Sequence, residues 1–450
     1  MTGITEKISS YLAAAPSKSL APEVRDKASQ HILDTLAAMV SGSRLVPGEM
    51  ALSYVRKYCG AGPATVVGSD LHTDVVNAAL ANGMCAHADE TDDSHVDSIT
   101  HPGCAVVPAA LALAEANGAS GATFVRAVVA GYDLCARMVM AVETVQLREN
   151  GHATHAFGGL FGAAAASAVV LGLDAARVPY LLSYAAQQAS GIFCWRRDPD
   201  HIEKACDFAG FPARNGVQAA TMVAHGMTGV ADALEGKQGF FEVFGPGIDP
   251  SPVWRDLGER SIIMETGIKK WSVGSPAQSA LDAVEAIRRE GLPPADEIES
   301  IRITLPSASA KVVDNGPMPN VNCQHLVALS IVEGAPTFES SHDHARMADL
   351  RIRALRDRTT LIYDEALVKA KPPRQGIVEI RLRDGRVLRH HARAVRGTAD
   401  NPMTFDEVAT KARDLMAPVL GRVRAEQVVD AAKRLDTLPD CRALAELLRA

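Results

Sequence analysis

The sequence predicts a mainly α-helical protein with an α+β second domain: a large, discontinuous all-helical domain and a smaller α/β domain. Three observations predict this fold class. Helical spacing of apolar residues dominates roughly the first 260 residues, strand-like alternation begins only after them, and helical patterns return near the end. We therefore expect a helical domain over 1–264, an α/β domain over 265–397, and helices over 398–450 that return to the first domain.

The first domain is expected to be a dense helical bundle. In residues 22–42, apolar side chains recur at helical spacing, and Gly42 ends the pattern. Three further stretches rich in alanine and glycine repeat the pattern: 105–118, 124–143 and 162–173. Small side chains let helix axes approach closely, so these helices should pack tightly.

Strand-like alternation marks the second domain. Ile301, Ile303 and Leu305 alternate with polar residues, which is the period of a strand with one buried face. In residues 377–392, two alternating runs are joined by Asp384-Gly385, a pair typical of tight hairpin turns. The segments between these strands have helical patterns.

The C-terminal segment is predicted to be helical again. Asn401-Pro402 favours a turn, and Thr404 with Glu407 makes a capping box in front of a helix that should run to about Met416. Two more helical patterns follow, over 424–438 and 442–450.

Composition and charge exclude several classes of protein. The net charge is −7, aromatic residues are 5%, and we see no basic run with interleaved aromatics, so no nucleic-acid partner is expected. We find no signal-like N-terminus and no apolar run long enough to span a bilayer, so no membrane association is expected. The eight cysteines include no C-x-x-C pair, which predicts reduced thiols. We expect a cytoplasmic protein.

The densest polar cluster is a loop of interleaved acids and histidines between two apolar helices. Its histidines are His87, His95 and His101, and its acids are Asp89, Glu90, Asp92, Asp93 and Asp97. At the edge of a helical core, such groups acquire shifted pKa values, and Pro102-Gly103 places His101 at a helix start, where anions are favoured. An acidic solvated loop is the plain alternative. A metal site is not expected, because neither H-x-E-x-H nor H-E-x-x-H occurs.

Three other segments carry candidate polar side chains. A glycine-rich helix entry over 150–162 holds His152 and His155, where backbone N–H groups can bind an anion although no P-loop is present. Residues 267–278 offer two lysines, hydroxyl groups and a glutamine at the expected domain junction, either as a carboxylate clamp or as a solvated turn. The loop 195–204 ends in Lys204 and is either a charged surface loop or a substrate contact.

Nearly the whole chain shares one resemblance. It rests on the segments ILDTLAAMVSG, NGMCAHADETDDSH, THPGCAVVPAALALAE, GLFGAAAASAVVLGLD, GFPARNGVQAA, KQGFFEVFG, IKKWSVGSPAQSALDA and MPNVNCQHLVALSIVEG. These resemble the MmgE/PrpD family, which includes 2-methylcitrate dehydratases, cis-aconitate decarboxylases and iminodisuccinate epimerases. The resemblance implies a large helical domain, a smaller α/β lid with the active site between them, a homodimer, a small polycarboxylate substrate, and no metal or organic cofactor.

The resemblance also assigns residues. The family pattern H-x-x-D-x-D-D-T-H is matched from His87 to His95, with Glu90 in place of the first functional Asp and Ser94 in place of Thr. His101 matches the family's His-Pro histidine, and the family's His-x-Thr falls on His152, with His155 as the alternative. The catalytic candidates are His101, His152, Glu90 and Lys269; the substrate-binding candidates are Ser94, Asp93, Asp92, Lys204, Lys270, Ser275, Gln278 and His155.

Three departures from the family pattern count against a true cis-aconitate decarboxylase. The family's Lys-x-x-His-x-Gly is present only as Lys204-Ala-Cys-Asp-Phe-Ala-Gly210, without its histidine and with the lysine one residue out of register. No tyrosine lies between Tyr184 and Tyr363, where the decarboxylases have an active-site tyrosine in the lid. Gly274 stands where their lid has a histidine.

The sequence therefore predicts a cofactor-independent lyase, of the 2-methylcitrate dehydratase-like hydro-lyase type. It would remove a proton next to a carboxylate of a di- or tricarboxylic acid, with His101 or His152 as base and the other histidine or a neutral Glu90 as acid. Lys269, Lys204 and the N–H groups near Gly103 or Gly158 would hold substrate carboxylates. An epimerase of a dicarboxylate such as iminodisuccinate, a non-catalytic carboxylate-binding protein and a metal enzyme are the alternatives.

Overall fold

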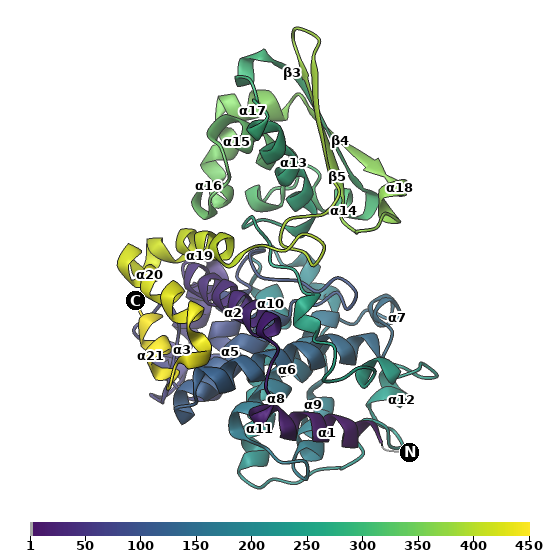
Figure 1. The fold of residues 1–450 in the computed structure, drawn as a ribbon, viewed down its shortest axis with the longest axis vertical. Coiled ribbons are helices and arrows are strands. Elements are labelled where there is room, and N and C mark those ends of the chain that lie inside the picture. The colour runs from purple at the N-terminus through teal and green to yellow at the C-terminus, as the bar shows by residue number, and fades with distance from the viewer. Residues whose placement is uncertain (1–2) are drawn as a thin grey trace. The chain divides into compact units, whose positions relative to one another are not determined.

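The computed structural model describes residues 3–450, which form two compact units (Figure 1). The first unit contains residues 3–266 together with Val408–Ala450, and the second is Gly267–Glu407. Within the described residues, the first unit has no strands besides a two-stranded ribbon, whereas the second combines helices with a four-stranded sheet. The predicted fold class, a large discontinuous helical domain and a smaller α/β domain, is confirmed.

Helices of very different lengths build the first unit. The long ones are α1 (Ile4–Ala14), α2 (Pro22–Gly42), α3 (Val46–Tyr58), α4 (Val75–Ala86), α5 (Pro102–Asn117), α6 (Gly121–Met140), α8 (Thr154–Leu171), α9 (Val178–Gln188), α11 (Phe211–Ala224), α19 (Phe405–Leu420) and α20 (Arg422–Lys433). The short elements are α7 (Thr144–Glu149), α10 (Ile202–Ala205), α12 (Phe240–Phe244), α21 (Arg442–Leu447), β1 (Ala64–Thr65) and β2 (His72–Thr73).

Helix α8 is the centre of the first unit and packs against α5, α6 and α11. By length and composition alone it is apolar enough to cross a membrane, which corrects the expectation that no apolar run is long enough, but 89% of that window is buried inside the protein. Its burial is that of a core helix, and its composition of alanine, glycine and valine explains why three helices can surround it.

Close helix contacts depend on glycine at two of these crossings. A Cβ atom at Gly216 of α11 would lie 2.6 Å from the Cβ of Ala163 and 2.6 Å from the backbone nitrogen of Ala164 in α8. A Cβ atom at Gly131 of α6 would lie 2.4 Å from a methyl group of Val106 in α5. Neither space can hold a side chain, so the small residues set the spacing of the bundle.

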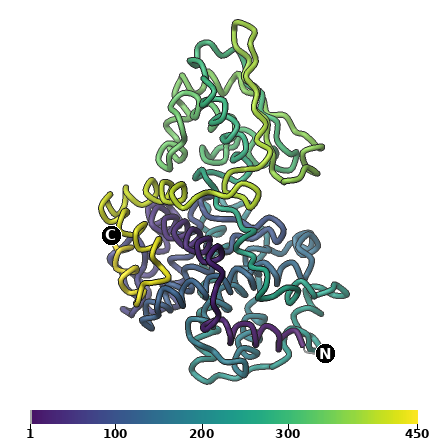
Figure 2. The backbone as a smooth tube through the Cα atoms, in the orientation of Figure 1, coloured from purple at the N-terminus to yellow at the C-terminus, as the bar shows by residue number. Residues whose placement is uncertain are grey.

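The C-terminal segment packs back on the start of the chain, as Figure 2 traces in yellow and purple. From α19, buried Lys411 places its Nζ 2.6 Å from Oδ1 of Asp34 in α2 and donates to the carbonyl oxygen of Thr91 at 2.9 Å. Burial raises the pKa of Asp34 to about 6, against the opposing effect of Lys411. Because Lys411 contacts both Asp34 and the backbone of Thr91, it links the acidic loop to α2 and α19.

The second unit contains a mixed sheet in the order β4-β3-β5-β6. Its strands are β3 (Ile298–Pro306), β4 (Thr359–Asp364), β5 (Gly376–Leu382) and β6 (Val387–Ala392). β3 pairs with β4 in parallel and with β5 in antiparallel, and β5 pairs with β6 in antiparallel. Ile301, Ile303 and Leu305 are buried while Arg302 is exposed, so the predicted alternation along this strand is confirmed.

The helices of the second unit are α13 (Gln278–Arg289), α14 (Ser307–Val313), α15 (Cys323–Glu333), α16 (Phe338–His342), α17 (Leu350–Arg356) and α18 (Glu365–Val368). α13 packs on β5 and β6, α15 packs against α13, and α17 packs against α15 (Figure 1). The predicted hairpin is confirmed, since Gly385 has a φ of +91° in the turn that joins β5 to β6. Thr404 and Glu407 form the predicted capping box of α19.

We predict that Gly216→Val destabilises the first unit. The added side chain must displace backbone atoms of α8, and overpacking of this kind costs about 1–3 kcal/mol. The melting temperature measured by circular dichroism should fall by several degrees. Gly60→Ala is the matched control, because a Cβ atom there meets nothing within 4 Å. Equal melting temperatures for the two variants would contradict the proposed packing.

Candidate active site

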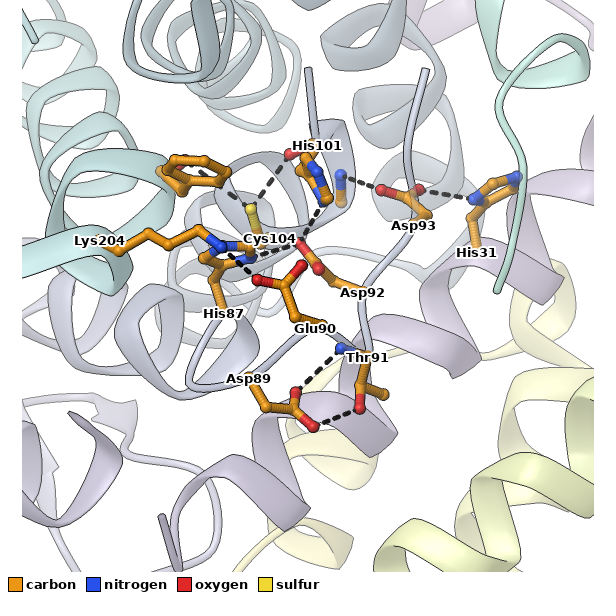
Figure 3. Close-up of polar contacts among 12 residues, drawn as sticks. His31, His87, Asp89, Glu90, Thr91, Asp92, Asp93, His101, Cys104 and Lys204 are labelled. Carbon is orange, nitrogen blue, oxygen red and sulfur yellow. Dashed lines mark hydrogen bonds and ion pairs between the residues drawn. The ribbon is translucent and has the colours of Figure 1, made fainter. Parts of the chain in front are cut away.

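The acidic loop joins the end of α4 to the start of α5 and is shown in Figure 3. Asp74 caps the N-terminus of α4 by accepting hydrogen bonds from the backbone of Val76 and Asn77, and Pro102 begins α5 directly after His101. The two helix ends therefore hold the loop at both sides, and most of its side chains are buried.

Asp92 is the shared partner of two histidines. Its Oδ2 lies 2.9 Å from Nδ1 of His87 and 3.1 Å from Nδ1 of His101. An ionised carboxylate only accepts hydrogen bonds, so each Nδ1 carries a proton. The side chains of Asp92 and His87 are fully buried, whereas that of His101 is 13% exposed. Among these three groups, His101 is the one that a substrate can reach.

Asp93 faces the opposite way and ties three helices together. It accepts hydrogen bonds from the hydroxyl group of Tyr132 in α6 at 2.5 Å and from the backbone nitrogen of Gly103 in α5 at 3.0 Å, and it lies 2.7 Å from Nδ1 of His31 in α2. Burial alone would raise the pKa of Asp93, but the contacts with His31 and Tyr132 outweigh it, so the pKa is lowered. These contacts give Asp93 a structural role. The backbone N–H of Gly103, which we expected to bind a substrate carboxylate, donates to Asp93 instead.

An aromatic ring separates two of the histidines. Phe208 stacks on His87 with ring centroids 4.3 Å apart and on His155 with centroids 3.6 Å apart. His155 in turn lies 5.3 Å from His101, centroid to centroid. Burial, followed by the charges of His101 and His87, holds the pKa of His155 well below its usual value. His155 is therefore a neutral imidazole next to His101.

An ion pair between Lys204 and Glu90 lies beside this cluster (Figure 3). Both side chains are 17% exposed. The ammonium group of Lys204 also lies over the rings of Trp195 and Phe208, at 5.5 and 5.1 Å from their centroids. A cation and a carboxylate thus stand at the edge of the histidine cluster, where they can contact an anionic ligand.

The register of Lys204 has a structural explanation. Residues Cys206–Gly210 form a π-helical turn between α10 and α11. A π turn holds one residue more than an α turn, which matches the one-residue offset of Lys204 from the family pattern. Counted back from Gly210, the position of the family's histidine is taken by Phe208, the ring that separates His87 from His155.

The other histidine candidate has different neighbours. His152 precedes α8, and its ring lies 5.4 Å from that of Phe157 and 5.6 Å from that of Phe244, centroid to centroid. The structure thus brings His155, rather than His152, into ring contact with His101. Gly158 lies inside α8, so its amide belongs to the helix and not to an anion site. Ser94 is buried in the acidic loop.

The second unit, described by itself, contains the four remaining candidates. Lys269 is buried. Lys270 pairs with Glu285 at 2.6 Å. Gln278 bonds the backbone of its own loop, accepting from the nitrogen of Trp271 and donating to two carbonyl oxygens, and Ser275 begins a short 3₁₀ turn. The contacts of Lys270 and Gln278 hold this loop in shape, and a role for Lys269 in catalysis stays a prediction.

Several residues near the cluster escaped the sequence analysis. They are His31, Tyr132, Asp207 and Phe208, whereas Trp195 and His201 belong to the loop 195–204 that the sequence had singled out. For Asp207 and Phe208 the signal was the missing histidine of the Lys204 motif, because these two residues stand beside and at its place. The others are single residues on distant helices, and nothing in their local sequence distinguishes them.

Asp207 lines a separate pocket of about 350 Å³ beside Trp195 and Glu203. Burial, with a smaller effect from the charge of Glu203, raises the pKa of Asp207 to about 8. One of its oxygens is buried without a hydrogen-bond partner among residues 3–450. The group is a carboxylic acid that keeps its proton in the fold at neutral pH.

We predict that Asp207→Asn changes how stability depends on pH. The unfolded chain loses this proton near the usual pKa of 3.8, while the folded chain keeps it to about pH 8. The folded state therefore binds the extra proton between these values, and this group lowers stability as pH rises. The variant, which cannot ionise, should exceed the wild type in unfolding free energy by at least about 1 kcal/mol at about pH 8 and converge with it near pH 4.

Exposed Asp200 in the same region is the control for this measurement. Thermal melts across the pH range should show wild-type behaviour for Asp200→Asn. A wild-type pH profile in Asp207→Asn would show that Asp207 is ionised in the fold.

Two family models together cover most of the chain. The MmgE/PrpD N-terminal domain matches residues 6–252, and the MmgE/PrpD C-terminal domain matches residues 271–437. Among curated proteins, a cis-aconitate decarboxylase-like protein of Aspergillus oryzae is 24% identical over 99% of this chain and 97% of its own length. The cis-aconitate decarboxylase of Homo sapiens is 24% identical over 100% of this chain and 95% of its own length.

A third relative agrees with these two. The cis-aconitate decarboxylase of Aspergillus terreus is 24% identical over 99% of this chain and 96% of its own length. Decarboxylases are lyases, so the similarity supports an enzyme of the lyase kind without fixing its reaction. The domain matches span both units of the structure, and on that evidence the chain belongs to the MmgE/PrpD family.

Proposed function

We propose that the chain is a hydro-lyase that removes a proton next to a carboxylate group of a small di- or tricarboxylic acid. The observation that carries the proposal is the His101–Asp92 pair, in which a partly exposed imidazole is held by a buried carboxylate. Its curated relatives act on a tricarboxylate by their names, which supports the substrate class. A homodimer in the cytoplasm is part of the same proposal.

His101 is the proposed base. A proton next to a carboxylate is weakly acidic, so its removal needs a positioned base. Asp92 holds the proton of His101 on Nδ1, which makes Nε2 the nitrogen that would take the substrate proton, and it stabilises the imidazolium that forms. His87 shares the same carboxylate and limits how far Asp92 can turn.

Charge must also be stabilised on the substrate as the proton leaves. Lys204 provides an ammonium group next to the cluster, and a substrate carboxylate can take the place of Glu90 as its partner. Glu90, released in this way, can take a proton from solvent and deliver it to the leaving hydroxyl group, which departs as water, while His101 returns the proton taken from carbon to solvent. His155 supplies a neutral ring beside His101, so it adds no positive charge that would oppose the imidazolium.

Proton NMR in D₂O tests the reaction with a panel of polycarboxylates that includes 2-methylcitrate, cis-aconitate and iminodisuccinate. A new alkene with loss of water supports the hydro-lyase. Loss of carbon dioxide would show that the enzyme is a decarboxylase and not a hydro-lyase. Deuterium uptake without net conversion would show that it is an epimerase. Calorimetric binding with neither exchange nor turnover would show a non-catalytic carboxylate-binding protein.

We predict that His101→Ala lowers kcat at least about a hundredfold, because a single general base contributes about 10²–10⁴-fold. The measurement is steady-state turnover of the substrate that the NMR panel identifies. Circular dichroism should show an intact fold, since the side chain lies at the edge of the core. His225→Ala, at an exposed position after α11, is the control and should keep wild-type turnover. Near-normal turnover of His101→Ala would remove His101 from the mechanism.

A second pair of variants separates the two histidines of the glycine-rich segment. We predict that His155→Gln lowers kcat at least about tenfold, because its ring borders His101, and that His152→Gln has the smaller effect. Turnover of both variants is compared under the same conditions. The opposite order would favour His152 as the functional residue.

A further inference from the structure

Two buried imidazole nitrogens in this cluster have no partner. Nε2 of His87 and Nε2 of His201 are both inaccessible to solvent and make no hydrogen bond within residues 3–450. His87 as a whole is fully buried. A buried polar atom without a partner destabilises the fold by about 1–3 kcal/mol. Two such atoms close together therefore indicate a ligand that binds both of them.

The two rings converge on one carboxylate. One ligand atom from each of His87, Glu90 and His201 lies within 4.8 Å of the others, and the two imidazole centroids are 5.5 Å apart. Two imidazoles and one carboxylate are the protein ligands of many zinc and non-haem iron centres. The three residues therefore offer a chemically complete set for a divalent transition-metal ion.

His87 also has the support that metal-binding histidines need. Its Nδ1 lies 2.9 Å from Oδ2 of buried Asp92. Histidine ligands almost always donate their second ring N–H to a carboxylate or carbonyl group, which fixes the tautomer and orients the lone pair toward the ion. Asp92 provides this contact to His87 while it also holds His101.

A second group of potential ligands is weaker. His87, Asp92 and Cys104 each offer one ligand atom, and these three atoms also lie within 4.8 Å of one another. However, Nδ1 of His87 is engaged with Asp92, and Sγ of Cys104 donates to the carbonyl oxygen of His101 at 3.1 Å. A thiol must lose its proton to bind a metal, so this group would have to break two contacts.

We propose that His87, Glu90 and His201 bind a divalent transition-metal ion of the Zn²⁺ type, and that this ion inhibits the reaction proposed above. Lys204 is the reason for inhibition. Its ammonium group is the cation that pairs with Glu90, and an ion bound to Glu90 competes with it for the same carboxylate. Because Lys204 is the proposed partner of a substrate carboxylate, the ion and productive substrate binding exclude each other. The inhibitory role rests on the proposed function; the ion site does not.

Calorimetry with ZnCl₂ on the chelator-treated full chain tests the site directly, and Co²⁺ visible absorption gives a second readout. We expect one ion per chain. His201→Asn should weaken binding at least about tenfold, the loss typical even of a residue that only supports a ligand. Asparagine tolerates positive φ, and His201 has a φ of +62°, so the substitution suits the backbone. Lys204→Met should tighten binding, because it removes the competing ammonium group.

Exposed His225 supplies the matched control for surface binding of the ion, and His225→Asn should bind Zn²⁺ as the wild type does. Circular dichroism verifies that each variant is folded. The site is overturned if the wild type binds no Zn²⁺, or if His201→Asn binds it as tightly as the wild type. Weaker binding in Lys204→Met would overturn the competition.

Turnover gives the separate test of inhibition. Zn²⁺ should inhibit the wild type, and the inhibition should require a higher concentration in His201→Asn. Faster turnover with the ion would overturn the inhibitory role while the calorimetry still supports the site. If no panel substrate is turned over, the proposed function fails but the binding experiment still decides the ion site.

Discussion

The structure of the site depends on one buried carboxylate, Asp92. An anion removed from water is costly unless donors surround it, and here two imidazole rings supply them. The same bonds fix the protonation pattern of His87 and His101, because a carboxylate cannot donate. A single electrostatic requirement therefore sets the loop conformation, the orientation of the reachable histidine and the direction of its lone pair.

Packing between small residues brings the aromatic part of the site into place. A Cβ atom at Gly83 of α4 would lie 2.9 Å from the backbone of Ala209, so the π turn can approach α4 only because this position is glycine. That approach lets Phe208 enter between His87 and His155. The apolar ring separates the two imidazoles and shields their faces from solvent. The spacing of the helices, which places this ring, therefore influences the electrostatics of the site.

The sequence predicted features that depend on local patterns. The hairpin at Gly385, the capping box at Thr404 and the polar loop after α4 all have short-range signals, and the structure contains each of them. The parallel pairing of β4 with β3 was missed, because it joins segments separated by several helices. For the same reason no pattern could show that Lys204 reaches Glu90, or that Phe208 stacks on His155. These contacts arise from tertiary packing of helices.

The π turn at Cys206–Gly210 holds one residue more than an ordinary α turn. Each residue advances an α-helix by about 100°, so an extra residue in ordinary winding would rotate everything before it to another side of the helix axis. The wider turn absorbs that rotation locally. Lys204 and the rest of α10 therefore lie on the side of the helix axis that an α-helix one residue shorter would give them.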